Sequence, residues 1–305
     1  MKAFHCDRFP LPIPPRNRFP LDKYARLRER VEYSVGLPVE LIESPRISLE
    51  DIALAHDGQY VARALSGDFS SEEQRLLGFP WSPALIDRAM HSAGGTLAAC
   101  RAAIEEGVAV NLAGGTHHAK HNSAAGYCLF NDVAIAARVV SAEARSARVL
   151  IVDADVHQGD GTAEILRGFP QLYTFSIHAQ GNFPTRKATS NLDVAVADGM
   201  GDVGYLRNFR DGVERAFLAA RPQVVIYLAG ADPYRDDRLG RLNLSKQGLK
   251  TRDQDLVDRC RRSHVPLAVV TAGGYAPNID DIVDIHAQTI QIASTYWQYF
   301  AQVGV

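Results

Sequence analysis

The sequence predicts an α/β fold, a three-layer sandwich in which helices flank a central, mainly parallel sheet. Five short apolar runs rich in Val and Ile predict the sheet, because strands buried on both faces lack alternating polar residues. The segments between these runs have the periodicity of amphipathic helices, and such alternation is typical of a parallel sheet covered by helices. No linker-like segment interrupts the 305 residues, so we expect one domain over residues 1–305.

The elements can be assigned in chain order. The first 50 residues predict proline-punctuated chain and one helix, in LDKYARLRERVEY. Ser82 and Pro83 predict the start of a second helix and Gly107 its end, since Ser caps helices, Pro suits the first helical position and Gly the residue after the last. Gly94 and Gly95 interrupt this helix, so we expect another segment to pack closely against them.

The remaining chain supplies the strands and their helices. The five apolar runs are VAVNLAG, ARVLIVDAD, LYTFSIH, PQVVIYLAGAD and PLAVVTAGGY. Amphipathic segments at 130–144, 205–220 and 246–263 predict helices between them. The segment DIVDIHAQTIQIASTYWQYFAQ predicts a final helix.

Composition argues against several classes of protein. With 46% hydrophobic and 22% charged residues and a formal net charge of -2, the chain looks globular and has no basic footprint for nucleic acid or anionic lipid. We expect no membrane span, because no run approaches the ~18 apolar residues that one requires. The cysteines are far apart and form no C-x-x-C pair, so we expect buried thiols in a cytoplasmic protein: Cys6, Cys100, Cys128 and Cys260.

Acidic and imidazole side chains follow the ends of two predicted strands, where α/β proteins bind ligands. Asp155 and His157 are two residues apart, so in extended chain their side chains point the same way, and Asp232 follows another run. Buried carboxylates repel one another unless a cation lies between them. Such ligands without thiolate fit zinc, iron(II), manganese or cobalt, and three protein ligands leave room for water and substrate. We therefore expect a catalytic metal site.

Further groups suited to acid–base chemistry follow other strands. His117 and His118 lie in the loop after the first run, and Asp153 and Asp160 flank the metal ligands. Each aspartate can accept a proton from one imidazole, which fixes its tautomer and raises its basicity. A histidine so oriented can act as general base and then general acid. Tyr275 follows two glycines after the last run, where its phenol can donate a hydrogen bond to a developing oxyanion.

Six motifs, in the order GTHHA, GYCLFND, DADVHQGDGT, SIHAQGNFP, AGADP and TAGGY, resemble the zinc-dependent histone deacetylase family. The likeness extends from about residue 19 to about residue 275. The segments FPWSPALIDRAMHSAGGTLAAC and DDRLGRLNLSKQGL are most similar to its class IV branch and to bacterial relatives. The resemblance implies an arginase/deacetylase-like sandwich and a single deacetylase-like catalytic domain.

The resemblance also implies a role for each motif residue. Asp153 would pair with His117 and Asp160 with His118, and Tyr275 would polarise the substrate carbonyl. The implied zinc ligands are Asp155, His157 and Asp232. The implied lining of a channel for a lysine side chain is Gly126, Tyr127, Phe183, Gly273 and Gly274. Family members also carry a potassium ion, for which the implied ligands are Asp153, Asp155, His157, Ser176 and Ile177.

The expected activity is zinc-dependent hydrolysis of an N-acyl amide, above all deacylation of acylated lysine in a peptide or protein. An amidohydrolase for acetylpolyamine or another small acylated amine is an alternative, and a silent acyl-lysine binding module that retains the metal is another. An arginase-like binuclear site needs more carboxylates than the sequence offers. Gln158, where many members have a second histidine, and Tyr127, in place of the common phenylalanine, weaken any transfer of substrate preference. We expect the loops at 8–20 and 66–82 to set the depth of the channel.

Overall fold

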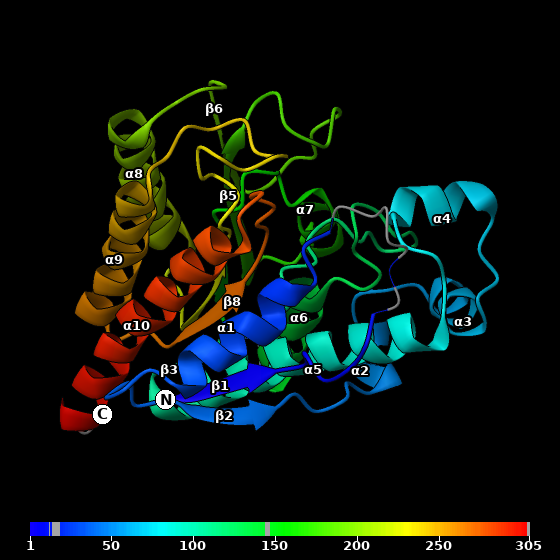
Figure 1. Ribbon diagram of the computed structural model, residues 1–305, viewed down its shortest axis with the longest axis horizontal. Coiled ribbons are helices and arrows are strands. Elements are labelled where there is room, and N and C mark those ends of the chain that lie inside the picture. The colour runs from blue at the N-terminus through cyan, green and yellow to red at the C-terminus, as the bar shows by residue number, and fades with distance from the viewer. Residues whose placement is uncertain (12, 14–18, 144–146, 304–305) are drawn as a thin grey trace.

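The computed structural model describes residues 1–11, 13, 19–143 and 147–303. At its centre lies a sheet of eight strands in the order β2-β1-β3-β8-β7-β4-β5-β6 (Figure 1). Every neighbouring pair is parallel. The strands are β1 (Lys2–His5), β2 (Glu40–Glu43), β3 (Val108–Asn111), β4 (Val149–Asp153), β5 (Leu172–Ala179), β6 (Leu192–Val196), β7 (Val224–Ala229) and β8 (Leu267–Thr271).

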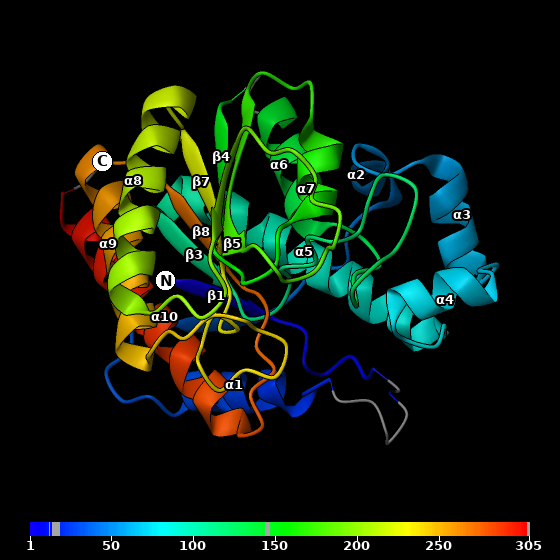
Figure 2. The ribbon, with the colours of Figure 1, turned by 90° about the horizontal axis from the view of Figure 1, so that it is seen from above.

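Helices cover both faces of the sheet and complete the three layers (Figure 2). The helices packed on one face are α1 (Asp22–Glu32), α8 (Asp202–Ala220), α9 (Lys246–Ser263) and α10 (Ile279–Val303). Those on the other are α5 (Pro83–Glu106), α6 (Asp132–Glu143) and α7 (Asp160–Leu166), with α2 (Leu49–Ala53), α3 (Gly58–Ser66) and α4 (Ser71–Leu77) outside them. The α/β sandwich predicted from the apolar runs is thus confirmed.

The central strands contribute side chains to both layers. In β4, Leu150 and Val152 pack with the helices of the α8 side, whereas Val149 and Ile151 pack with those of the α5 side. Each such fully buried side chain stabilises the fold by roughly 1.5–3 kcal/mol. Alternate residues of a strand face opposite sides of the sheet, and both sides are covered here. Apolar residues are therefore needed at every position, which is why these strands appear in the sequence as continuous apolar runs.

Helix α5 has the ends and the internal contact that its sequence predicts. The Ser82 side chain accepts a hydrogen bond from a backbone amide of the first turn, and Gly107 follows the last helical residue with a φ of 86°. A Cβ on Gly94 would lie 1.9 Å from the carbonyl oxygen of Pro45. A Cβ on Gly95 would lie 2.4 Å from Oγ of Ser44. The segment after β2 therefore packs directly against the helix backbone.

The N-terminal prediction is incomplete. The helix expected in LDKYARLRERVEY is confirmed as α1, but β1 and β2 also lie within the first 50 residues, and β6 was not predicted. The segment 66–82 contains α4, which starts with a reciprocal hydrogen-bond pair between Ser70 and Glu73. Parts of two predictions, residues 12 and 14–18 of the first channel loop and residue 144 of a helix, lie outside the described residues.

Two predictions from composition can be compared with the structure. All four cysteines are buried and unpaired, as expected. Within the described ranges, no helix combines the length and the apolar character needed to cross a membrane.

Candidate active site

The titratable and metal-ligating side chains meet at the carboxyl ends of neighbouring strands. Because the sheet is parallel, β3, β8, β7 and β4 all open at the same edge, and the loops that follow them lie side by side. They surround a cavity of about 310 Å³. Its walls include His117 and His118 after β3, Asp155 and His157 after β4, and Tyr275 after β8.

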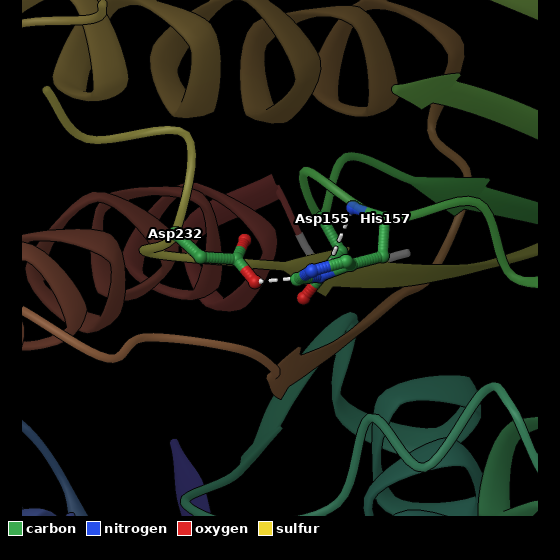
Figure 3. A group of neighbouring side chains, drawn as sticks. All are labelled: Asp155, His157 and Asp232. Carbon is green, nitrogen blue, oxygen red and sulfur yellow. Dashed lines mark hydrogen bonds and ion pairs between the residues drawn. The ribbon is translucent and has the colours of Figure 1, made fainter. Parts of the chain in front are cut away.

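The side chains of Asp155, His157 and Asp232 point toward one another (Figure 3). Asp155 and His157 also line the cavity. The Nδ1 atom of His157 lies 2.9 Å from Oδ1 of Asp155 and 3.2 Å from Oδ2 of Asp232. One ligand atom from each residue lies within 4.8 Å of the other two, and all three residues are buried. The Oδ2 atom of Asp232 accepts no well-oriented hydrogen bond, although it is fully enclosed. An enclosed oxygen of this kind is a good candidate for a metal ligand.

Backbone groups hold both carboxylates in place. The amide of Val156 donates to Oδ1 of Asp232 over 2.9 Å, and the amide of Gly273 donates to Oδ2 of Asp155 over 2.8 Å. A Cβ on Gly273 would lie 2.0 Å from Oδ2 of Asp232 and 2.5 Å from Oδ2 of Asp155. The backbone can approach both carboxylates only because this residue is glycine.

The electrostatics of this group fit a bound cation. Burial lowers the pKa of His157, but Asp155 and Asp232 outweigh it and raise the pKa to about 10. Burial and the charge of Asp155 raise the pKa of Asp232 to about 7. Burial acts in the same sense on Asp155, yet the positive charges of His117 and His157 hold its pKa well below the usual value. Two carboxylates and an imidazole that share one positive charge are a donor set suited to a divalent ion such as zinc.

The tandem histidines are each oriented by a carboxylate. Nδ1 of His117 lies 2.7 Å from Oδ2 of Asp153, and Nδ1 of His118 lies 2.7 Å from Oδ1 of Asp160. The two Nε2 atoms face each other at 3.2 Å. Burial lowers the pKa of His117, but Asp153 and Asp155 raise it to about 9, whereas burial and the charge of His117 lower the pKa of His118 to about 3. At neutral pH the pair therefore consists of one charged and one neutral imidazole.

Tyr275 lines the same cavity from the loop after β8. Its backbone amide donates a hydrogen bond to Oδ2 of Asp237 over 2.6 Å. Burial, together with the charges of Asp155 and Asp232, raises the pKa of the phenol well above its ordinary value. The hydroxyl thus keeps its proton and can donate a hydrogen bond into the cavity.

Comparison with known proteins decides the family. The family model of the histone deacetylase domain matches residues 18–290. This chain belongs to the histone deacetylase family. That conclusion confirms the resemblance of its six motifs and makes the protein a member of a family of hydrolases.

Similar proteins differ in how much of their length the chain covers. An uncharacterized protein of Picosynechococcus sp. is 38% identical over 286 residues, which is 93% of this chain and 95% of that protein. Histone deacetylase 6 of Arabidopsis thaliana is 32% identical over 300 residues, and histone deacetylase 2 of the same plant is 34% identical over 185 residues. These matches cover 90% and 60% of this chain but only 59% and 48% of the two plant proteins.

Solved structures support the fold of this deacetylase-family protein. An HDAC homolog from Aquifex aeolicus superimposes with a TM-score of 0.80 at 20% identity, over 96% of this chain and 84% of that one. An HDAC homolog complexed with SAHA gives a TM-score of 0.80 at 21% identity, over 96% of this chain and 83% of that one.

Four of the five predicted channel residues line the cavity: Gly126, Tyr127, Phe183 and Gly273. Gly126 and Tyr127 have φ values of 54° and 67°, and their amides donate to the carbonyls of Leu76 and Leu77 at the end of α4. The segment 66–82 therefore holds this wall in place. The Phe183 ring is 44% exposed, and its centroid lies 4.8 Å from that of His118.

The fifth predicted channel residue, Gly274, differs from the expectation. It does not belong to the described cavity wall, because its free side faces Ile282 of α10 and Ala231. Its carbonyl oxygen instead lies 3.3 Å from the buried ammonium of Lys23, which also reaches the carbonyl of Ala272 at 3.4 Å. Lys23 thus anchors the chain on both sides of Gly273.

Three of the five residues expected to hold potassium lie on two adjacent strands. Asp153 at the end of β4 is the register partner of Ser176 on β5, and Ile177 follows it. The Ser176 hydroxyl lies 3.0 Å from Nδ1 of His178. The remaining members of the expected set are Asp155 and His157 of the metal-binding group.

Several positioning contacts were missed from the sequence. The carboxylate of Asp132 accepts hydrogen bonds from the amides of Gly115 and Thr116, which fixes the loop before the tandem histidines. The neighbouring Asn131 side chain donates to the carbonyl of His117 over 3.3 Å. The adjacent polar residues Asn131 and Asp132, at the end of the motif GYCLFND and at the start of α6, are the sequence signal for this role.

Gln158 stands where many family members have a second histidine. Its Nε2 donates to the carbonyl of Ala188 over 3.0 Å and its Oε1 accepts from the amide of the same residue over 2.8 Å. Nε2 also donates to Asp193 of β6. Gln158 therefore ties the loop that carries Asp155 and His157 to the far end of the segment that carries Phe183.

Proposed function

We propose that this protein is a zinc-dependent hydrolase that removes acyl groups from lysine side chains of peptides or proteins. The observation that carries the proposal is the convergence, beside one cavity, of three buried side chains that could hold a metal ion, two carboxylate-paired imidazoles and the phenol of Tyr275. Asp155, His157 and Asp232 would hold the ion, for which iron(II) is the alternative to zinc. A potassium ion near Asp153 and Ser176 would be structural, and residues 1–305 would act as one catalytic domain.

The reaction assigns a separate task to each residue. A divalent ion held by these residues would polarise the amide carbonyl and lower the pKa of a water molecule. His118, oriented by Asp160 at 2.7 Å, accepts the proton of the attacking water and later delivers it to the departing amine. His117, oriented by Asp153, contributes positive charge beside the reacting carbonyl. The phenol of Tyr275 donates a hydrogen bond to the carbonyl oxygen as this atom gains negative charge.

The shape and charge of the cavity favour a lysine side chain over a polyamine. Tyr127 and Phe183 offer aromatic faces to an aliphatic chain. Among the described residues of the cavity wall, Asp155 carries the carboxylate, and we assign it to the metal. Arg241 contributes a guanidinium to the same wall. The guanidinium of Arg241 is itself paired with Asp198 at 3.2 Å. A polyamine substrate would therefore meet no unpaired carboxylate among these wall residues.

Parallel turnover measurements test the proposal. Zinc-loaded and iron(II)-loaded protein would be given an acetyl-lysine peptide, a peptide with a longer acyl-lysine and an N-acetylated polyamine, with Asp155→Ala as the control that lacks a metal ligand. We expect release of acyl group from at least one lysine peptide and none in the control. Turnover of the polyamine alone would replace our proposal by the small-amine alternative, and no turnover with tight peptide binding would favour the silent binding module.

A further inference from the structure

Arg252 of α9 is a fully buried cation that lies outside the cavity. Its Nη1 atom donates hydrogen bonds to two backbone carbonyls, that of Ala154 over 3.1 Å and that of Gly230 over 2.8 Å. Its Nε and Nη2 atoms each lie 2.9 Å from Oδ1 of Asp253, which supplies the compensating charge. A guanidinium so completely enclosed requires this pairing, because an unpaired buried charge is strongly destabilising.

The two carbonyls belong to the segments that carry the carboxylate ligands. Ala154 directly precedes Asp155 at the end of β4, and Gly230 lies two residues before Asp232 at the end of β7. These strands are neighbours in the sheet. One nitrogen atom of Arg252 therefore bridges the two backbone segments that carry the proposed ligands Asp155 and Asp232.

Other side chains fix the position of the guanidinium. The hydroxyl of Tyr227 on β7 donates to Oδ1 of Asp253 over 2.6 Å, and the hydroxyl of Thr289 on α10 donates to Oδ2 over 2.6 Å. Asp253 is thus held by one strand of the sheet and by a second helix. Its carboxylate thereby orients Arg252 toward the two carbonyls.

We propose that Arg252 is a positioning residue of the metal centre, which sets the separation of Asp155 and Asp232 and thereby the affinity for the ion. This inference rests on the metal site of the proposed function. Residues that orient metal ligands from outside the coordination sphere typically change metal affinity about 10- to 100-fold when they are replaced. Arg252→Lys keeps the charge but cannot present the same planar set of donors, so we expect a loss of that size.

Arg88 of α5 offers a matched control. It is also buried, and its Nη1 atom also donates to two backbone carbonyls, those of Cys6 at 2.7 Å and Phe9 at 2.9 Å. These carbonyls belong to a segment that carries no proposed ligand. The dissociation constant for zinc would be measured by competition with a chromophoric chelator in the parent, Arg252→Lys and Arg88→Lys. The unfolding temperature of each metal-free protein and the visible spectrum of each cobalt(II)-loaded protein complete the comparison.

We expect both substitutions to lower the unfolding temperature, but only Arg252→Lys to weaken zinc binding about 10- to 100-fold and to alter the cobalt(II) spectrum. Unchanged affinity and spectrum in Arg252→Lys, or equal losses of affinity in both variants, would overturn the inference. If Arg252→Lys does not fold, Tyr227→Phe and Thr289→Val each remove one hydrogen bond to Asp253, and unchanged zinc affinity in both has the same consequence. A parent that binds no zinc, or an Asp155→Ala variant that keeps it, would instead refute the proposed metal site.

Discussion

Single side chains at the site derive their proposed roles from contacts between distant parts of the chain. The tandem histidines and the metal-binding group could be predicted because each stands directly after an apolar run, where a parallel sheet gathers such residues. Lys23 and Asp237 could not, since their partners are the backbone of residues 272–275 and no local pattern indicates a contact over such a separation. Backbone anchoring by a single side chain is visible only once the fold is known.

Replacing Tyr275 by Phe removes one hydroxyl and leaves the metal-binding group intact. We expect the turnover number to fall about 10²- to 10³-fold, the usual effect of losing one donor to a developing oxyanion, while zinc content stays that of the parent. Steady-state kinetics on the acyl-lysine peptide and metal analysis would be run on the same preparation. A turnover number within a few-fold of the parent value would remove Tyr275 from the mechanism.

At the scale of elements, burial decides what the sequence can predict. The five predicted strands are buried along their whole length, apart from one half-buried position in β5. The three missed strands are short, and β2 and β6 form the edges of the sheet, where exposed residues interrupt the apolar pattern. β1 is four residues long and pairs with β2 (residues 40–43) and β3 (residues 108–111). Its pairing therefore depends on contacts between segments that are far apart in the sequence.

The contact between α5 and the segment after β2 gives an element-scale prediction. Gly94→Ala places a methyl group 1.9 Å from the carbonyl oxygen of Pro45, which forces the helix and that segment apart. Overpacking of this kind typically costs about 1–3 kcal/mol. Gly58→Ala in the first turn of α3 is the control, because its Cβ meets no atom within 4 Å. Urea unfolding of both variants would show the difference, and equal midpoints would contradict the close packing.

At the scale of the whole molecule, one parallel sheet accounts for both the core and the site. Its two covered faces bury the apolar runs, and its carboxyl edge gathers polar side chains that are far apart in the sequence. The same packing buries ionisable side chains in the core. Burial lowers the pKa of His56 to about 4 and that of His286 to about 3.

These two histidines predict a loss of stability in mild acid. An unfolded histidine takes up its proton near pH 6.5, whereas the folded His56 does so only near 4, so the stabilisation present above pH 6.5 is lost as the pH falls. Each contributes up to about 1.4 kcal/mol per pH unit in this window. His117 and His157, whose pKa values are raised, contribute fully below pH 6.5. The lowered pKa of His118 adds to the decline, whereas the pKa of about 7 for Asp232 opposes it, because the folded carboxyl takes up its proton before the unfolded one does. The contribution of His56 is therefore the difference between the parent and a variant that lacks this imidazole.

The free energy of unfolding of chelator-treated protein would be followed by urea between about pH 7 and about pH 5. His56→Gln should show a shallower decline than the parent, since glutamine can still accept the hydrogen bond that the amide of Asn131 donates to His56 Nε2. Equally steep declines in the parent and in His56→Gln would contradict the assignment of a neutral buried His56.

The most direct test of the metal site is anomalous X-ray scattering at the zinc edge from crystals grown with zinc. The proposed function predicts one strong peak about 2.0–2.2 Å from a carboxylate oxygen of Asp155, from Nδ1 of His157 and from a carboxylate oxygen of Asp232. A crystal that contains zinc elsewhere but shows no peak among these three residues would contradict it.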